Sequence, residues 1–157
     1  MKKLLFILLL SPLLIFSQSK KAVKYFNAGE EAFSNGNYQT ALKNYSKAIK
    51  KYNKYYAAYL NRGNSYANIG EFDNAINDYD NAITINSKDK DGYYNRGYIY
   101  RTMGKYEEAL KDFDKAIDLN PNKLESYISK GKFFNHAYKF KEKHVDFILN
   151  DLRDKVR

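Results

Sequence analysis

Between residues 22 and 140, small and aromatic residues recur at helical spacing, and this spacing restarts twice in every 34 residues. Within 56–89, two stretches each place such residues at i, i+4 and i+7, first Tyr59, Gly63 and Tyr66 and then Ala75, Tyr79 and Ala82. This spacing puts each trio on one face of a helix. Gly70 falls between the stretches, where a helix end favours a left-handed residue. The pattern predicts a pair of helices joined by a short turn.

The same columns recur along the chain with a period of 34 residues. Glycine fills one column at Gly29, Gly63, Gly97 and Gly131, and alanine fills another at Ala41, Ala75 and Ala109. Small residues let the two helices approach closely, and aromatic side chains fill the space that remains. A single helix hairpin cannot bury both of its faces, so successive units are expected to stack on one another.

These columns resemble the tetratricopeptide repeat family. Unit 3 (90–123) matches the family signature at Tyr93, Gly97, Tyr100, Gly104, Tyr106, Ala109, Phe113, Ala116 and Pro121. Unit 2 (56–89) departs from it at Ser87, and unit 1 (22–55) departs at Ala32 and Asn53. The resemblance implies an all-α solenoid of three helix-turn-helix repeats followed by a degenerate fourth.

The fourth unit (124–157) begins like the others and then departs from the pattern. Tyr138 replaces the turn glycine, and Lys143 and Asn150 replace the two alanines. These larger polar residues would block a fifth unit from docking. The apolar residues of 142–157 still follow an amphipathic pattern, so we expect a terminal capping helix of the kind that solenoids need. The alternative is a dimerisation helix.

Residues 1–19 have the three-part pattern of a secretory signal peptide. Two lysines precede an apolar run over 4–16, and small polar residues follow it. The run is shorter than the ~20 residues that span a bilayer. We therefore expect export, to a periplasmic, outer-envelope or extracellular destination. The alternative is a retained N-terminal membrane anchor.

Composition argues against catalysis and cofactors. The chain has no Cys and only two His, which removes thiol chemistry and cysteine-ligated metals. His136 and His144 do not form a metalloprotease motif, and no nucleophile elbow or phosphate-binding glycine loop is present. We expect neither an enzyme nor a bound cofactor or metal. Despite the net charge of +9, export makes a nucleic-acid partner unexpected.

A charge correlation links two columns of the repeat. Arg62, Arg96 and Lys130 occupy position 7 where Asp78, Asp112 and Asp146 occupy position 23, whereas unit 1 has Ala28 and Asn44. Because the acid appears only where the base does, we predict an ion pair between the two helices of units 2, 3 and 4. The alternative is two independent solvated charges.

The resemblance also implies a peptide-binding groove, lined by the first helix of each unit. Position 6 is Asn27, Asn61 and Asn95 in units 1 to 3 and Ser129 in unit 4, and side-chain amides can bind a peptide backbone without reading its sequence. The alternative is that asparagine is merely common at this position. The other candidate groove residues are Asn64, Tyr94, Tyr98, Arg101 and Lys132. Tyr94 and Tyr98 lie outside the aromatic columns of the repeat and are therefore not expected in the core.

Some members of this family clamp a C-terminal carboxylate with lysines, arginine and asparagines at fixed positions. Here Phe26 and Glu30 replace the first Lys and Asn, and Asp91 and Asn95 replace the later Lys and Arg. A clamp of that type is not expected.

The sequence thus predicts a non-catalytic adaptor that binds a protein or an extended peptide. The alternative is a structural role, in which the chain self-associates or docks on an envelope surface through its C-terminal helix or a basic face. The basic face comprises Lys43, Lys47, Lys50, Lys51 and Lys54, and the pattern favours a simply solvated convex face over a docking surface.

Overall fold

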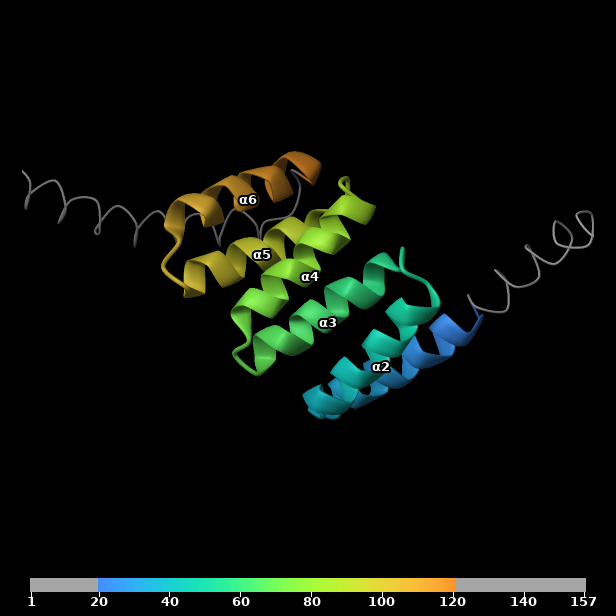
Figure 1. Cartoon of the computed structure of the whole chain (residues 1–157). Helices are drawn as coiled ribbons and strands as arrows, with labels where there is room; N and C mark the ends of the chain where they lie inside the picture. Colours follow the sequence, from blue (N-terminus) through green and yellow to red (C-terminus); the bar gives the residue numbers. More distant parts are fainter. Residues whose placement is uncertain (1–19, 121–157) are drawn as a thin grey trace, which may run out of the picture.

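The computed structural model describes residues 20–120, and all regular structure in this part of the chain is helical (Figure 1). A first helix over 20–34 is followed by α2 (Tyr38–Lys51), α3 (Tyr56–Asn68), α4 (Phe72–Ile85), α5 (Lys90–Thr102) and α6 (Tyr106–Leu119). The fold is an all-α tetratricopeptide solenoid, as predicted. The expected signal peptide, fourth repeat and C-terminal helix lie outside the described residues, as do Gly131 and Lys132.

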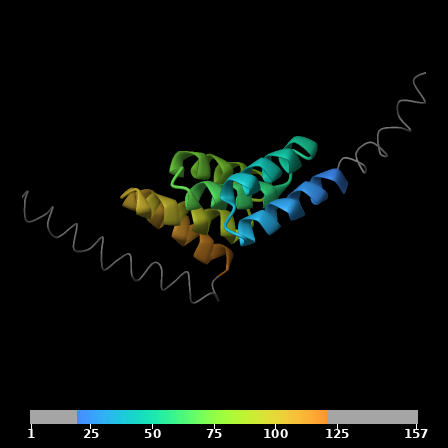
Figure 2. The ribbon, with the colours of Figure 1, turned by 90° about the horizontal axis from the view of Figure 1, so that it is seen from below.

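Successive helices pack as neighbours along the solenoid (Figures 1 and 2). The helix α3 packs on both α2 and α4, and α5 packs on both α4 and α6. The helices α3 and α5 also touch each other directly. The first helices of neighbouring repeats therefore share one face of the array, as the groove prediction requires.

Each repeat turns between its helices in the same way. At Gly36, Gly70 and Gly104 the backbone φ angles are 73°, 79° and 76°, a left-handed conformation that glycine adopts without steric cost. Around Gly70, the Glu71 N–H donates to the carbonyl of Tyr66 at 2.9 Å, and the Gly70 N–H donates to that of Ala67 at 3.1 Å. These paired bonds close the end of α3 as a Schellman motif, and the role predicted for Gly70 is confirmed.

The core of each repeat joins a glycine of the first helix to an aromatic ring of the second. Tyr45, Tyr79 and Phe113 are buried, together with Ala41, Ala75 and Ala109. A Cβ added to Gly63 would lie 2.7 Å from Cε1 of Tyr79, closer than real contacts allow. The close helix approach predicted from the glycine column is therefore present, and the aromatic ring occupies the space that a side chain would need.

The predicted ion pairs of units 2 and 3 are present. Arg62 donates from Nε and Nη2 to the two carboxylate oxygens of Asp78, both at 2.7 Å. Arg96 forms the same bidentate pair with Asp112, with distances of 2.8 Å from Nε and 2.7 Å from Nη2 to the carboxylate oxygens. Both aspartates are buried. The bond to Asp112 raises the pKa of Arg96, although burial opposes the shift. The pair predicted for unit 4 lies outside the described residues.

Each arginine also reaches the preceding repeat, which the sequence columns did not suggest. Nη1 of Arg62 donates to Ser46 Oγ at 3.0 Å, and Nη1 of Arg96 pairs with Asp80. Ser46 and Asp80 stand at the same position of units 1 and 2. The ion pairs therefore connect neighbouring repeats as well as the two helices of one repeat.

None of the helices within residues 20–120 is both long and apolar enough to cross a membrane.

Candidate peptide-binding groove

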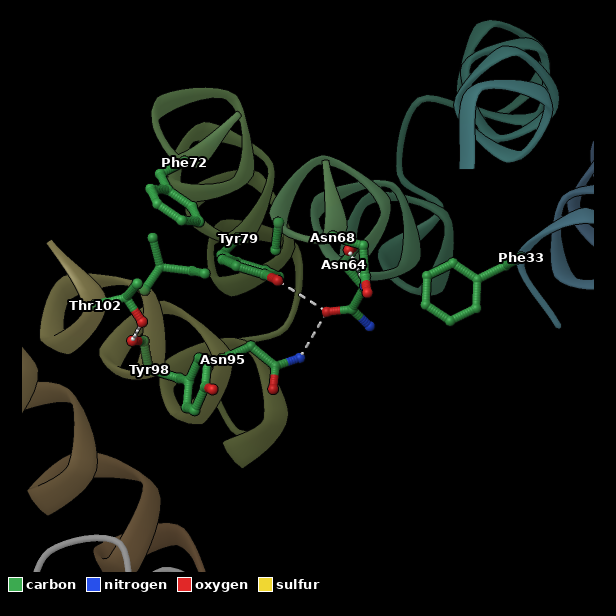
Figure 3. Close-up of a pocket in the computed structure, with 10 residues that line it drawn as sticks. Phe33, Asn64, Asn68, Phe72, Tyr79, Asn95, Tyr98 and Thr102 are labelled. Atoms are coloured by element: carbon green, nitrogen blue, oxygen red, sulfur yellow. Dashed lines mark hydrogen bonds between the residues drawn. The ribbon is translucent and has the colours of Figure 1, made fainter. Parts of the chain in front are cut away.

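The shared face of the first helices carries a pocket of about 500 Å³ between repeats 2 and 3 (Figure 3). Its lining combines residues of the first helix, α3, α4 and α5: Phe33, Asn64, Ala67, Asn68, Phe72, Tyr79, Asn95, Tyr98, Ile99 and Thr102. Side chains that are distant in sequence meet here because the repeats stack, so the pocket belongs to the array and not to one hairpin.

The pocket has an apolar base and polar edges. Ile99 and Tyr79 are buried members of one core cluster, against which Phe72 packs. Asn64 and Asn95 supply amide groups beside them, and Tyr98 keeps 48% of its surface exposed. A pocket with apolar walls and a few oriented polar groups is the usual form of a binding site.

A relay of hydrogen bonds orients the asparagines. Oδ1 of Asn64 accepts from Nδ2 of Asn95 at 3.0 Å and from the Tyr79 hydroxyl at 2.8 Å (Figure 3). Because both bonds reach its oxygen, the Asn64 NH₂ group remains the part that can serve a ligand. The carbonyl oxygen of Asn95 is left as an acceptor. The Asn64 NH₂ group can donate and the Asn95 oxygen can accept, and a single peptide unit requires both kinds of group.

The bond between Asn95 and Asn64 has a counterpart one repeat earlier, with a carboxylate as the acceptor. Nδ2 of Asn61 donates to Oε1 of Glu30 at 3.0 Å, across the same sequence separation as the Asn95–Asn64 bond. Position 6 of one repeat thus donates to position 9 of the repeat before it. The predicted row of asparagines exists, but one N–H of both Asn61 and Asn95 is used within the protein. In each of these two residues, one amide N–H is therefore not available to a peptide.

Glu30 lines a second pocket of about 350 Å³. Glu30, Phe33, Ser34, Tyr45, Asn61 and Asn64 line it, so it shares Phe33 and Asn64 with the larger pocket. Burial, followed by the nearby charge of Glu30, raises the pKa of Tyr45 to about 12. The groove therefore contains two adjacent pockets, one of which carries a carboxylate.

The predicted groove residues of repeat 3 have different environments. Tyr98 is exposed, and the guanidinium carbon of Arg101 lies 4.5 Å from the centre of its ring. Tyr94 instead packs against the core pair Ala109 and Phe113, with its ring centre 5.8 Å from that of Phe113. The expectation that Tyr94 lies outside the core is wrong, because α5 turns this residue toward α6.

The structure brings Asn61, Asn64, Asn95 and Tyr98 to the two pockets, whereas Asn27 is exposed and Arg101 half-buried, and neither lines them. Lys132 lies outside the described residues. Sequence reasoning missed the apolar base of the larger pocket. Phe72 and Tyr79 belong to repeat columns that predict core, and only the stacking shows that their edges also reach the groove.

No group of three or more metal-ligating side chains occurs between residues 20 and 120.

Two models of the tetratricopeptide repeat family match this chain. One, described as tetratricopeptide repeat, covers residues 91–123, and the other, described as TPR repeat, covers residues 63–104. No curated protein matches the chain. The family-model matches and the described fold together support the assignment of these repeats to the tetratricopeptide repeat family.

Solved structures of tetratricopeptide domains are similar over three quarters of the chain. The first domain of Spaghetti (RPAP3), bound to the HSP90 peptide SRMEEVD, is 27% identical; the match covers 76% of this chain and 95% of that one, with a TM-score of 0.74. The Arabidopsis OM64 domain is 24% identical over 76% and 98% of the two chains, with a TM-score of 0.73. The second domain of human RPAP3, in complex with the HSP70 peptide SGPTIEEVD, is 23% identical. The match covers 76% of this chain and 97% of that one, with a TM-score of 0.68.

Proposed function

We propose that this protein is a non-catalytic adaptor that holds an extended segment of a partner protein in its groove, in an exported or cell-envelope setting. The observation that carries the proposal is the larger pocket, where an apolar base lies beside the free donor of Asn64 and the free acceptor of Asn95. The apolar base offers room for a side chain, and the two amides offer bonds to the backbone of the same segment.

Two further observations support this proposal. Tyrosine and arginine are the residue types most enriched at interface hot spots, and Tyr98 and Arg101 stack on each other in repeat 3. The RPAP3 domain bound to an HSP90 peptide shares this fold at 27% identity. The exported setting rests on the signal-peptide pattern of residues 1–19.

The test is a comparative affinity capture from envelope and extracellular fractions of the source cells. A groove variant with Asn95→Ala, Tyr98→Ala and Arg101→Ala is compared with the unchanged chain. Tyr94 is left intact because it packs against Phe113. We expect partners that bind the unchanged chain to be lost from the groove variant. Partners retained equally by both would contradict groove binding.

A second candidate function is docking on an anionic envelope surface through the basic face. Lys43, Lys47 and Lys50 are exposed on α2. A positively charged surface attracts polyanions over distances up to about a Debye length. The variant Lys43→Ala, Lys47→Ala, Lys50→Ala therefore serves as the matched control in the capture. Loss of partners from this variant alone would favour the basic face.

A further inference from the structure

Glu30 is an exposed acid that lines the smaller pocket, and its carboxylate has no cationic partner among residues 20–120. Its one hydrogen bond in the described part of the chain comes from the neutral amide of Asn61, at 3.0 Å. No lysine or arginine within residues 20–120 lies within ion-pair distance of it. By contrast, Asp78 and Asp112, which are both buried, each have an arginine. Glu30 is thus a groove acid whose charge the described fold leaves unneutralised.

Aromatic groups surround this carboxylate. Phe33 and Tyr45 line the same pocket. The pKa values of Tyr45 and Tyr55 are both raised, mainly by burial and secondly by the negative charge of Glu30. The carboxylate therefore acts on both tyrosines. Aromatic faces attract cations and also pack against the methylene stem of a long side chain. A carboxylate beside two aromatic rings is suited to a Lys or Arg side chain.

The larger pocket adjoins this one and has a different preference. Phe33 and Asn64 line both pockets, so nearby side chains of a single segment can enter the two together. Asn64 stands between the pockets with its oxygen occupied by Tyr79 and Asn95. Its NH₂ group is therefore available to a backbone carbonyl of the segment.

We propose that the groove selects a segment in which a Lys or Arg lies close to an apolar residue, with the cation at Glu30 and the apolar side chain in the pocket of Ile99 and Tyr79. This inference rests on the proposed function, because it specifies what the groove binds. Glu30 also disfavours acidic segments. The peptide SRMEEVD bound by the RPAP3 domain has both an arginine beside a methionine and an acidic C-terminal end.

The test measures binding of blocked, fluorescein-labelled peptides to the full chain by anisotropy. Each peptide has a Gly/Ser backbone with one Leu and, two or three positions away, a Lys, a Gln or a Glu. We expect the Lys peptide to bind about two- to fivefold more tightly than the Gln peptide, the scale of an exposed ion pair. The Glu peptide should bind most weakly. Because the chain carries a net charge of +9, its overall field favours the opposite order.

Two variants separate the local effect from the general one. Glu30→Gln should abolish the preference for Lys over Gln, while Glu31→Gln, an exposed acid that lines neither pocket, should preserve it. Equal binding of the Lys and Gln peptides to the unchanged chain would overturn the inference and leave groove binding intact. A preference that survives Glu30→Gln would also overturn it.

The apolar half of the inference has its own control. A peptide in which Leu is replaced by Ser should bind several-fold more weakly, and equal binding would overturn that half. Tyr98→Ala should weaken all the Leu-containing peptides by a similar factor, because it changes the pocket and not the charge. Failure of every peptide to bind the unchanged chain would overturn both the inference and the proposed function.

Discussion

Repeat 1 and the two repeats that follow it use different polar groups to join their two helices. Position 7 is Ala28 in repeat 1 but Arg62 in repeat 2. Across from Ala28, Asn44 donates to its backbone carbonyl at 3.5 Å, a weak and neutral contact. Across from Arg62 stands the buried carboxylate of Asp78. Both arrangements close a helix pair, so the hairpin itself does not require the ion pair.

The difference shows what the arginine contributes. Arg62 and Arg96 each donate to the preceding repeat, at Ser46 and Asp80. Among residues 20–120, no repeat precedes the one that contains Ala28. Both arginines thus join their own repeat to the one before it, and we interpret their column as a connection between repeats.

The groove differs between the same two regions. Repeat 1 contributes Glu30 and Phe33, whereas repeat 3 contributes Tyr98 and Arg101. The pocket of repeat 1 thus carries a carboxylate, whereas repeat 3 presents an exposed tyrosine that stacks on an arginine outside the pockets. An extended ligand would meet unlike ends, which gives the groove a direction.

The largest expected effect is on the ion pair of repeat 3. Arg96→Ala leaves Asp112 buried without a partner, and we expect a loss of about 3 kcal/mol in the free energy of unfolding, measured by urea denaturation of the full chain. The control Arg101→Ala, which removes an arginine stacked on an exposed ring, should cost less than about 1 kcal/mol. Equal losses would contradict the role assigned to Arg96. The double variant Arg96→Met, Asp112→Leu should recover most of the loss, because no unpaired charge remains.

The next effect compares the glycine column of repeats 1 and 3. A Cβ on Gly29 would lie 2.6 Å from Cε1 of Tyr45, whereas one on Gly97 would lie 3.1 Å from its nearest neighbours. Gly29→Ala should therefore destabilise the chain by about 1–3 kcal/mol through overpacking. Gly97→Ala should lose less, because the clash is milder and alanine favours the helix. Thermal unfolding of both variants tests the order, and the reverse order would contradict it.

A smaller effect is expected at the hydroxyl that orients Asn64. Tyr79→Phe removes the 2.8 Å bond to Asn64 Oδ1 and should lower the free energy of unfolding by about 1 kcal/mol. Repeat 3 already has Phe113 at this position. The same variant should also weaken binding of the Leu-containing peptides, since Asn95 alone then holds the Asn64 amide. Tyr66→Phe, on the same repeat, is the control and should leave peptide binding unchanged.

The smallest effect is expected from grafting the ion pair into repeat 1. The double variant Ala28→Arg, Asn44→Asp supplies both partners but no earlier repeat within the described part of the chain to receive the third bond. We expect the free energy of unfolding to change by no more than about 1 kcal/mol, as for a simple paired charge near the surface. Urea denaturation provides the measurement. A gain as large as the loss in Arg96→Ala would show that the pair stabilises the single hairpin.

Much of the fold was predictable because the same residue types recur at the same positions in successive units. Gly63 beside Tyr79 and Gly70 at the turn have identical counterparts in other units, so chance could be excluded without any structure. The pairing of Arg62 with Asp78 was predictable for the same reason, since the two columns vary together. The candidate groove was only partly predictable. Asn64, Asn95 and Tyr98 were named, but Tyr94 was wrongly expected outside the core.

The sequence by itself determined the helices, the turns, the small and aromatic core columns and the ion pairs within a repeat, because each depends on contacts repeated at a fixed spacing within one unit. Only the tertiary structure decided which atoms the groove leaves free. The bond from Asn95 to Asn64, the bond from Asn61 to Glu30 and the sharing of Phe33 by two pockets all cross between repeats. Such contacts depend on how one unit sits on the next, and no spacing within a unit encodes that geometry.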